Sequence, residues 1–305
     1  MKRLSTFGNT IANWFDAARQ PDTSKPGVDW LRVLPFLGMH LACAAVIWVG
    51  WSPFAVLFAL AAYLVRMFSV TAFYHRYFAH RTFKTSRAAQ FVFAVLGNTC
   101  VQRGPLWWAA HHRVHHRSSD KPEDPHSPVQ YGFFRSHVGW ILDRANFRTR
   151  IEEVPDFARY PELRFLDRFD TVVPILLAAA IFGLGTILER LAPGLGTSGP
   201  QLLIWGFFIS TVVLYHGTFT INSLAHVFGT RPYKTGDASR NNWFLALITF
   251  GEGWHNNHHH YPGSVRQGFR WWQVDFSWYL LSLLALCGVV WDLRKVPDGA
   301  LLRPT

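Results

Sequence analysis

The chain of 305 residues has few cysteines and few charged side chains. Its three cysteines, Cys43, Cys100 and Cys287, show no paired spacing, which argues against a disulfide framework and against a cysteine cluster for an iron–sulfur centre. Only 16% of the residues are charged and 50% are hydrophobic, which excludes a disordered or fibrous chain. A globular protein remains, either soluble or embedded in a membrane.

Several sequence signatures are also missing. Residues 1–30 contain no apolar core followed by a small-residue cleavage site, which argues against a removable signal peptide. No nucleic-acid-binding motif accompanies the net charge of +11, so anionic headgroups or an acidic ligand are the expected partners, and not nucleic acid. The zinc-protease pattern His-Glu-x-x-His and internal repeats are absent. We therefore expect one integrated domain over residues 1–305.

The apolar residues gather in four stretches, each close to the roughly 20 residues that a helix needs to cross a bilayer. The connectors between the first two and between the last two are too short to hold a domain, which predicts two transmembrane hairpins in an all-α membrane protein. Of the 30 Lys and Arg residues, 27 lie in segments 1–30, 74–170 and 222–305, and cationic segments mark the cytoplasmic side. We expect a cytoplasmic helical cap from residues 74–170 and 222–305. The four predicted spans are 31–50, 53–73, 171–191 and 201–221.

Three shorter segments are apolar or amphipathic without being long enough to span. Ala88 to Val101 and Phe276 to Trp291 have lengths typical of interfacial or re-entrant segments. Phe7 to Ala18 fits either an interfacial helix or a frayed terminus.

Fifteen histidines are far above ordinary usage, and ten of them fall in three short clusters. The clusters span residues 75–80, 111–116 and 255–260, and each lies at or beyond the predicted end of a span. His226 stands alone just after the fourth span. Because neutral imidazole is a good ligand for iron, zinc or copper, these clusters predict a metal site.

The spacing within the clusters supports this interpretation. Residues i, i+3 and i+4 share one face of an α-helix, so two of the clusters can each point three imidazoles in one direction. His75 and His80 are five residues apart and converge only at a helix end or in an unwound turn. With His226 they make nine potential ligands, enough for two ions. The sets that share a face are His112, His115 and His116, and His255, His258 and His259.

The remaining histidines and the nearby carboxylates receive a plainer interpretation. An isolated histidine is most often a packed or solvated side chain, which is what we expect for His40, His126, His137 and His216. The pairs Glu123-x-x-His126 and Glu252-x-x-His255 contain a proline and a glycine, so neither suits a helix interior. The site is therefore expected to be nearly all histidine.

These motifs resemble one family, the membrane-bound fatty acyl desaturases, and within it the stearoyl-CoA (position-9) type with its bacterial relatives. The resemblance extends from about residue 31 to about residue 291. It rests on His75-Arg-Tyr-Phe-Ala-His80-Arg81, His112-Arg-Val-His-His116, Asp124-Pro-His126, Gly132-Phe-Phe-Arg-Ser-His-Val-Gly-Trp140, Asn222-Ser-Leu-Ala-His226, Arg231-Pro-Tyr233 and Gly251-Glu-Gly-Trp-His-Asn-Asn-His-His259.

The resemblance implies a set of metal ligands. Asn222 matches the position that reaches one metal through a water molecule. His111 and His260 fall beside the motif positions and serve as internal controls. The implied histidine ligands are His75, His80, His112, His115, His116, His226, His255, His258 and His259.

The resemblance also implies the reaction, an oxygen-dependent desaturation that uses two iron ions to place a cis double bond in a saturated acyl chain. Long-chain acyl-CoA or acyl-lipid is the implied substrate, and a bacterial inner membrane with a cytoplasmic active site is the implied location. The 305 residues show no electron-carrying module of their own, so a separate ferredoxin or b-type cytochrome with its reductase is the expected donor. Animal acyl-CoA members carry an Arg-Asp pair where this chain has Ala110-His111, which leaves acyl-CoA, phospholipid and carrier protein open as the head group.

Aromatic and apolar side chains near the clusters are candidates for the acyl tunnel. One to three turns before His75, Tyr63, Met67 and Val70 are expected at its floor. Trp107, Trp108 and Trp254 are candidates for its walls, with anchoring at the membrane interface as the equally good alternative.

Two rival functions stay open on the sequence alone. A hydroxylase with a similar iron pair differs from a desaturase only after the first C–H step. A metal transporter or metal-binding membrane protein is the rival from another class, although transporters place ionisable ligands within the bilayer.

Overall fold

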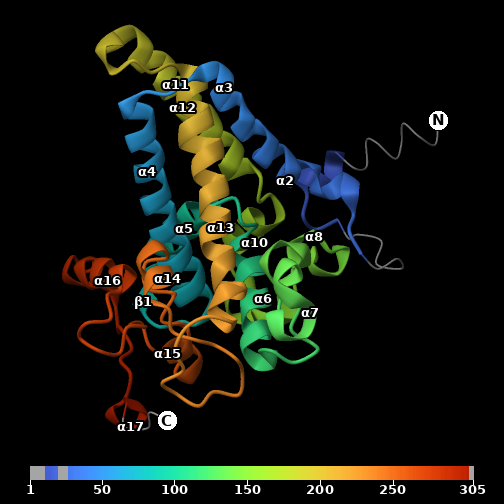
Figure 1. Ribbon diagram of the computed structural model, residues 1–305, viewed down its shortest axis with the longest axis vertical. Helices are drawn as coiled ribbons and strands as arrows, with labels where there is room; N and C mark the ends of the chain where they lie inside the picture. The colour runs from blue at the N-terminus through green and yellow to red at the C-terminus, as the bar shows by residue number, and fades with distance from the viewer. Residues whose placement is uncertain (1–10, 20–26, 302–305) are drawn as a thin grey trace.

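The computed structural model describes residues 11–19 and 27–301 of this chain (Figure 1). In this part, four helices are long and apolar enough to cross a membrane. They confirm the four predicted stretches, but the second and fourth continue past residues 73 and 221 and carry His75 and His226 at their ends. Apart from one pair of two-residue strands, the regular structure described is helical. The four helices are Trp30–Val49, Pro53–Ala79, Val172–Leu191 and Gly199–His226.

A short connector joins the first two spans. The first consists of α2 (Trp30–Ala42), η1 (Cys43–Ala45) and α3 (Val46–Val49), and it ends at Gly50, whose φ of 65° favours glycine. Ser52 then caps α4 (Pro53–Phe68), because its hydroxyl accepts a hydrogen bond from the Ala55 backbone nitrogen at 3.1 Å. The helix continues as a π-helix, η2 (Ser69–Ala79).

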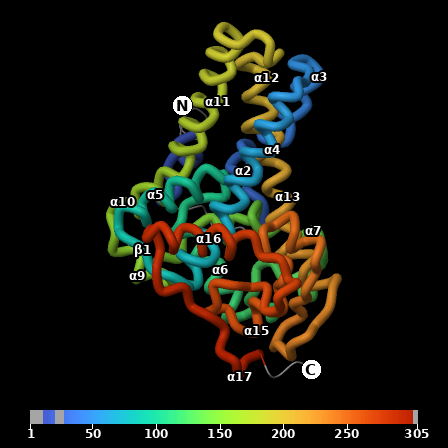
Figure 2. The backbone as a smooth tube through the Cα atoms, turned by 90° about the vertical axis from the view of Figure 1, so that its left-hand side faces the viewer, coloured from blue at the N-terminus to red at the C-terminus, as the bar shows by residue number. Residues whose placement is uncertain are grey.

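The third span is α11 (Val172–Leu191), and η6 (Pro193–Leu195) connects it to the fourth. The fourth consists of α12 (Gly199–Leu203), the π-helix η7 (Ile204–Ile209), α13 (Ser210–Asn222) and η8 (Leu224–His226). The connectors after α3 and after α11 lie at one end of the molecule, and the segments that carry the histidine clusters lie at the other (Figures 1 and 2).

The remaining elements form the histidine-bearing end of the molecule. β1 (Lys84–Thr85) pairs antiparallel with β2 (Val290–Trp291), which joins the two segments that follow the second and fourth spans. A large buried core packs η2 against α5 and α6. The helices of this end are α5 (Arg87–Asn98), α6 (Pro105–Ser118), α7 (Pro128–Phe134), η3 (Arg135–Gly139), α8 (Trp140–Leu142), η4 (Arg144–Asn146), η5 (Ile151–Glu153), α9 (Pro155–Ala158), α10 (Pro161–Arg168), α14 (Trp243–Ile248), α15 (His255–His260), α16 (Phe276–Leu286) and α17 (Asp298–Leu301).

The shorter apolar segments form helices that are too short to span. α5 has 12 residues and α16 has 11, and both expose apolar side chains such as Val92 and Leu286. Of the segment Phe7 to Ala18, expected to be either an interfacial helix or a frayed terminus, residues 11–15 are helical and residues 7–10 lie outside the described part of the chain.

Candidate metal centre

The π-helix η2 solves the spacing problem of the first histidine cluster. In a π-helix, backbone hydrogen bonds join residues five apart, so His75 and His80 lie one turn from each other. The His80 nitrogen donates to the His75 carbonyl at 3.2 Å, which closes this turn. Their rings come within 4.8 Å, measured between centroids. The convergence expected at a helix end is therefore achieved by a wider helix.

The second and third clusters lie on the helices α6 and α15. Pro105 opens α6 at a position where a missing backbone N–H costs nothing. Before α15, Gly253 packs so tightly that an added Cβ would lie 2.1 Å from the Ala246 nitrogen. This contact seats the short helix α15 against α14.

The structure gathers the nine histidines into two groups, within each of which the candidate ligand atoms lie within 4.8 Å of one another. We call them the first group and the second group. Adjacent residues can belong to different groups, since His116 points to the first and His115 to the second. The first group is His75, His80, His112, His116 and His258, and the second is His115, His226, His255 and His259.

The spacing of the ring nitrogens in the first group suits a shared metal ion. The Nε2 atoms of His80 and His112 are 2.8 Å apart, and those of His112 and His116 are 3.0 Å apart. Two nitrogen ligands at right angles, each about 2.1 Å from one ion, lie about 3.0 Å apart. Because His75 donates from Nδ1 to Glu252 at 2.5 Å, its Nε2 has a free lone pair, and that atom lies 3.1 Å from Nε2 of His258. Lone pairs this close favour a cation between them.

The second group has the same character. Nε2 of His226 lies 3.0 Å from Nε2 of His255, and Nε2 of His259 is buried without a hydrogen-bond partner. A buried nitrogen without a partner is costly, and a metal ion would satisfy it. The donor set of both groups therefore fits metal ions that prefer imidazole.

Carboxylates bind the outer nitrogens of the second group. Asp124 accepts from Nδ1 of His115 at 2.9 Å, and Asp120 accepts from Nδ1 of His226 at 2.8 Å. Asp237 accepts from Nδ1 of His259 at 2.6 Å. Such bonds fix the tautomer and the orientation of a ligating ring.

These bonds also keep the carboxylates ionised. Burial alone would raise the pKa of Asp120, but the hydrogen bond from His226 lowers it to about 2. Burial would also raise the pKa of Asp237, but the hydrogen bond from His259 outweighs burial and holds this pKa far below its usual range. Three negative charges therefore surround the second group at neutral pH.

A buried network supports the first group. Glu252 contacts His75 and also Arg76, which is fully buried and forms a second ion pair with Asp275 at 2.9 Å. Gln267 donates to Glu252 at 2.9 Å. Glu252 therefore binds the outer nitrogen of His75 and does not point into the group, in keeping with the expected all-histidine donor set.

Burial keeps most of these imidazoles neutral. It lowers the pKa of five of them well below the ordinary value, and neighbouring histidines add to the effect. Burial also lowers the pKa of His259, to about 4, against the opposing effect of Asp237. Neutral rings are the form that binds metal. The five are His80, His112, His116, His255 and His258.

The other histidines of the clusters lie outside both groups. His111 turns away from them, and its Nδ1 lies 2.9 Å from the Trp107 carbonyl. His260 stacks on Tyr233 with ring centroids 4.2 Å apart. His126 is packed, as expected, and it stacks on His115 at 4.4 Å and lies with Asp124 at the edge of the second group.

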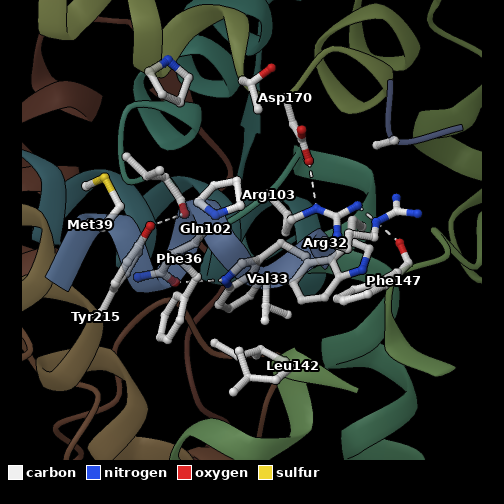
Figure 3. A pocket seen from close by; sticks show the side chains of 18 of the residues that line it. Arg32, Val33, Phe36, Met39, Gln102, Arg103, Leu142, Phe147, Asp170 and Tyr215 are labelled. Carbon is white, nitrogen blue, oxygen red and sulfur yellow. Dashed lines mark hydrogen bonds and ion pairs between the residues drawn. The ribbon is translucent and has the colours of Figure 1, made fainter. Parts of the chain in front are cut away.

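A cavity of about 800 Å³ reaches the first group at His112 (Figure 3). Trp107, Trp108, His112 and Asn222 line it, which places two predicted tunnel residues and the expected water-mediated ligand on its wall. In Figure 3, Met39 and Tyr215 lie at one end and Arg32 and Phe147 at the other. Its shape and apolar lining suit a long aliphatic chain.

The other four tunnel candidates do not line this cavity. Met67 and Val70 are buried in the main core, and the Tyr63 hydroxyl donates to the Ile248 carbonyl at 2.6 Å. Gly217 on α13 allows this close packing, because an added Cβ would lie 3.1 Å from the Tyr63 hydroxyl. Trp254 is buried and lines a separate small pocket.

Sequence reasoning missed two features. Asp120, Asp124 and Asp237 received no role, although Asp124 stands in one of the recognised motifs. His40, His216 and His137 were expected to be isolated, but they are joined in one line, with nitrogen–nitrogen distances of 3.3 Å and 3.0 Å. The line ends at the Ser223 hydroxyl, 2.9 Å from Nδ1 of His137. Only contacts between distant segments create it, so no local pattern could indicate it.

His111 gives a pH-dependent prediction. Burial lowers its pKa from 6.5 to about 3, so the unfolded chain binds a proton that the folded chain does not. Stability from this residue is complete above pH 6.5 and is lost as the pH falls toward 3; at pH 5 the loss is about 2 kcal/mol. We expect the thermal midpoint of the metal-free protein in detergent to fall less between pH 7.5 and pH 5 in His111→Gln than in the wild type. Equal falls would contradict this assignment.

Comparisons with known proteins agree with these observations. The family model for fatty acid desaturases matches residues 48–285. An acyl-CoA C20 Delta5-desaturase of Anemone leveillei is 37% identical over 88% of this chain and 83% of the relative. An sn-1 stearoyl-lipid 9-desaturase of Anabaena variabilis is 34% identical over 89% of this chain and 96% of the relative. Delta-9 acyl-lipid desaturase 2 of Arabidopsis thaliana is 37% identical over 90% of this chain and 86% of the relative.

Proposed function

Since this chain belongs to the fatty acid desaturase family, we propose that it introduces a cis double bond, at position 9, into a saturated long-chain acyl substrate. The observation that carries the proposal is an apolar cavity that reaches one of two all-histidine groups, through His112. The reaction removes two hydrogens from a methylene pair and consumes one O₂, two electrons and two protons to release two waters.

The two groups are the proposed holders of two iron ions. The first group would hold one ion and the second group the other, with Asn222 reaching one of the two ions through a water molecule. When bound, the iron ions supply the oxygen activation that cleavage of an unactivated C–H bond requires. The carboxylates of Asp120, Asp124, Asp237 and Glu252 accept from the outer nitrogens of four of these rings, which orients the rings and leaves their Nε2 atoms available as ligands.

The cavity is the proposed site of the acyl chain. Trp108 stacks on His112 with centroids 5.0 Å apart, so a chain that passes Trp108 lies beside the first group. The apolar lining excludes water from the reacting carbons. The histidine-bearing end is proposed to face the cytoplasm, with the spans as two hairpins in a bacterial inner membrane, and the electrons to come from a separate ferredoxin or b-type cytochrome with its reductase.

Expression in a host that lacks desaturation tests this function. We expect monounsaturated chains with the double bond at position 9, located by mass spectrometry after derivatisation of the double bond. A double bond at position 5, the position in the name of the Anemone relative, would support the desaturase reaction and contradict position 9. A hydroxylated chain without a double bond would show that the protein is a hydroxylase and not a desaturase.

A polar network in the cavity wall gives a second test of the acyl site. Gln102 donates to the Thr218 hydroxyl at 2.9 Å and lies 3.4 Å from the Trp108 indole nitrogen. Gln102→Ala frees Trp108 to shift against the chain, and small shifts near reacting atoms cost about tenfold to a hundredfold in rate. We expect kcat to fall by that amount while bound iron stays unchanged. A loss of iron equal to the loss of activity would show that the network is part of the metal site.

A further inference from the structure

The cavity opens sideways between two spans. Leu34 on α2 and Ile175 on α11 both line it, and both are about half exposed on the surface of their helices. Phe15, from the N-terminal helical segment, lines the same opening and is also exposed. A molecule that already lies in the bilayer can therefore enter without passing through water.

One arginine at this end of the cavity is available to a ligand. The Arg32 guanidinium lies 4.8 Å from the Phe147 ring and donates to the Arg19 carbonyl at 3.1 Å. No carboxylate within the described ranges forms an ion pair with it, since Asp29 accepts only from its backbone nitrogen. Arg32 is the third residue of α2, at the start of the first candidate span and near the exposed Trp30, and span ends are where headgroups meet hydrocarbon.

The neighbouring arginines are already paired. Arg103 binds Asp170 at 2.7 Å, and Arg168 binds Asp16 at 2.8 Å. The nucleotide of coenzyme A carries a diphosphate and a further phosphate, which would call for several unpaired cations. A single phosphodiester carries one negative charge and would call for only one unpaired cation.

Among the described residues that line the cavity, the only other Arg, Lys, Asp or Glu side chains are Arg103 and Asp170, which pair with each other. Trp140 also lines the cavity, and its buried indole nitrogen has no hydrogen-bond partner in the described part of the chain.

From these contacts we propose that the substrate is a glycerophospholipid of the membrane, whose phosphate binds Arg32 while its acyl chain enters the cavity between α2 and α11. This inference rests on the proposed function, which it narrows from acyl substrates in general to an acyl-phospholipid. Arg32 then holds the head group in place and sets how far the chain reaches past Trp108.

Binding to the purified, iron-loaded protein in detergent tests the inference. We expect dioctanoyl-phosphatidylglycerol to raise the thermal midpoint, and stearoyl-CoA, dioctanoyl-galactosylglycerol and inorganic phosphate at the same concentration to raise it less. Arg32→Gln should weaken the binding of the phospholipid about tenfold or more, because a charge-assisted hydrogen bond is lost. Arg32→Lys should restore part of it. Arg190→Gln, at the far end of α11, is the matched control and should bind like the wild type.

Two outcomes would overturn the inference. One is stabilisation by stearoyl-CoA or the galactolipid that equals or exceeds that by the phospholipid. The other is unchanged phospholipid binding in an Arg32→Gln protein that retains its iron. The proposed function is judged separately, by product analysis: double bonds formed without Arg32-dependent phospholipid binding would refute only the head-group assignment, and Arg32-dependent binding without double bonds would refute only the desaturase function.

Discussion

Replacing His258 by alanine is expected to abolish double-bond formation and to lower the amount of bound iron. His258 is buried, and its Nε2 lies 3.1 Å from that of His75 and 2.9 Å from that of His116. Its removal takes one nitrogen from the centre of the first group. Loss of a residue that only supports a ligand costs about 10- to 100-fold, so loss of a ligand should reduce product by more than about 100-fold.

Iron per chain, measured by mass spectrometry, and unsaturated product from the same preparation check this expectation. His260→Ala is the matched control, because His260 lies on the same helix but outside both groups. The neighbours His112 and His111 on α6 provide a second pair, in which only His112→Ala should lose iron and product. Equal losses within either pair would show that the ligand assignment is displaced along the helix.

The histidine sites could be predicted because their geometry is local. The spacing of residues 112, 115 and 116 fixes one helical face, and the four spans follow from the lengths of apolar stretches. What the spacing cannot give is the division of that face between two groups. His115 and His116 differ by about 100° around α6, and only the packing of η2, η8 and α15 against that helix decides which ring meets which.

The cavity that we propose for the acyl chain was harder to predict for the same reason. Tyr63, Met67 and Val70 have the right distance from His75 along the chain, yet they pack against α13 and the core. The cavity instead lies between α2, α11 and α13, where Phe36, Ala178 and Phe219 contribute to its wall. Side chains from segments far apart in sequence enclose it, and periodicity within one helix carries no information about them.

The supporting carboxylates show a third limit. Asp120 and Asp237 lie in loops with no periodic pattern, and each bonds to a histidine that is distant in the sequence. A sequence search for metal ligands finds imidazoles in clusters, but it cannot tell which single carboxylate bonds to the outer nitrogen of each ring. Asp124 is the one of the three that carries a sequence signal, since it stands two residues before His126 in the motif Asp124-Pro-His126.

Asp237→Asn is expected to weaken iron binding at the second group by about 10- to 100-fold and to reduce product accordingly. In the wild type, the ionised carboxylate accepts from Nδ1 of His259, which keeps the lone pair of that ring on Nε2. An amide offers a donor as well as an acceptor, so the ring can take the other tautomer and place its proton on Nε2, where it cannot bind metal. The neutral amide also removes one of the negative charges that favour a bound cation.

Iron affinity and thermal stability together separate this mechanism from a general loss of structure. Iron titration of the metal-free protein should show weakened affinity in Asp237→Asn, and Asp237→Glu should recover part of it because the carboxylate is restored. The surface variant Asp292→Asn, which breaks only an exposed ion pair with Lys84, should match the wild type. Normal iron affinity in Asp237→Asn would mean that His259 does not depend on this carboxylate for its tautomer. We expect the thermal midpoint of the metal-free Asp237→Asn protein to stay close to that of the wild type, because the substitution keeps the Oδ1 atom that accepts from Thr235 and Ser239. A loss of iron without a fall in this midpoint would assign the loss to the His259 ring.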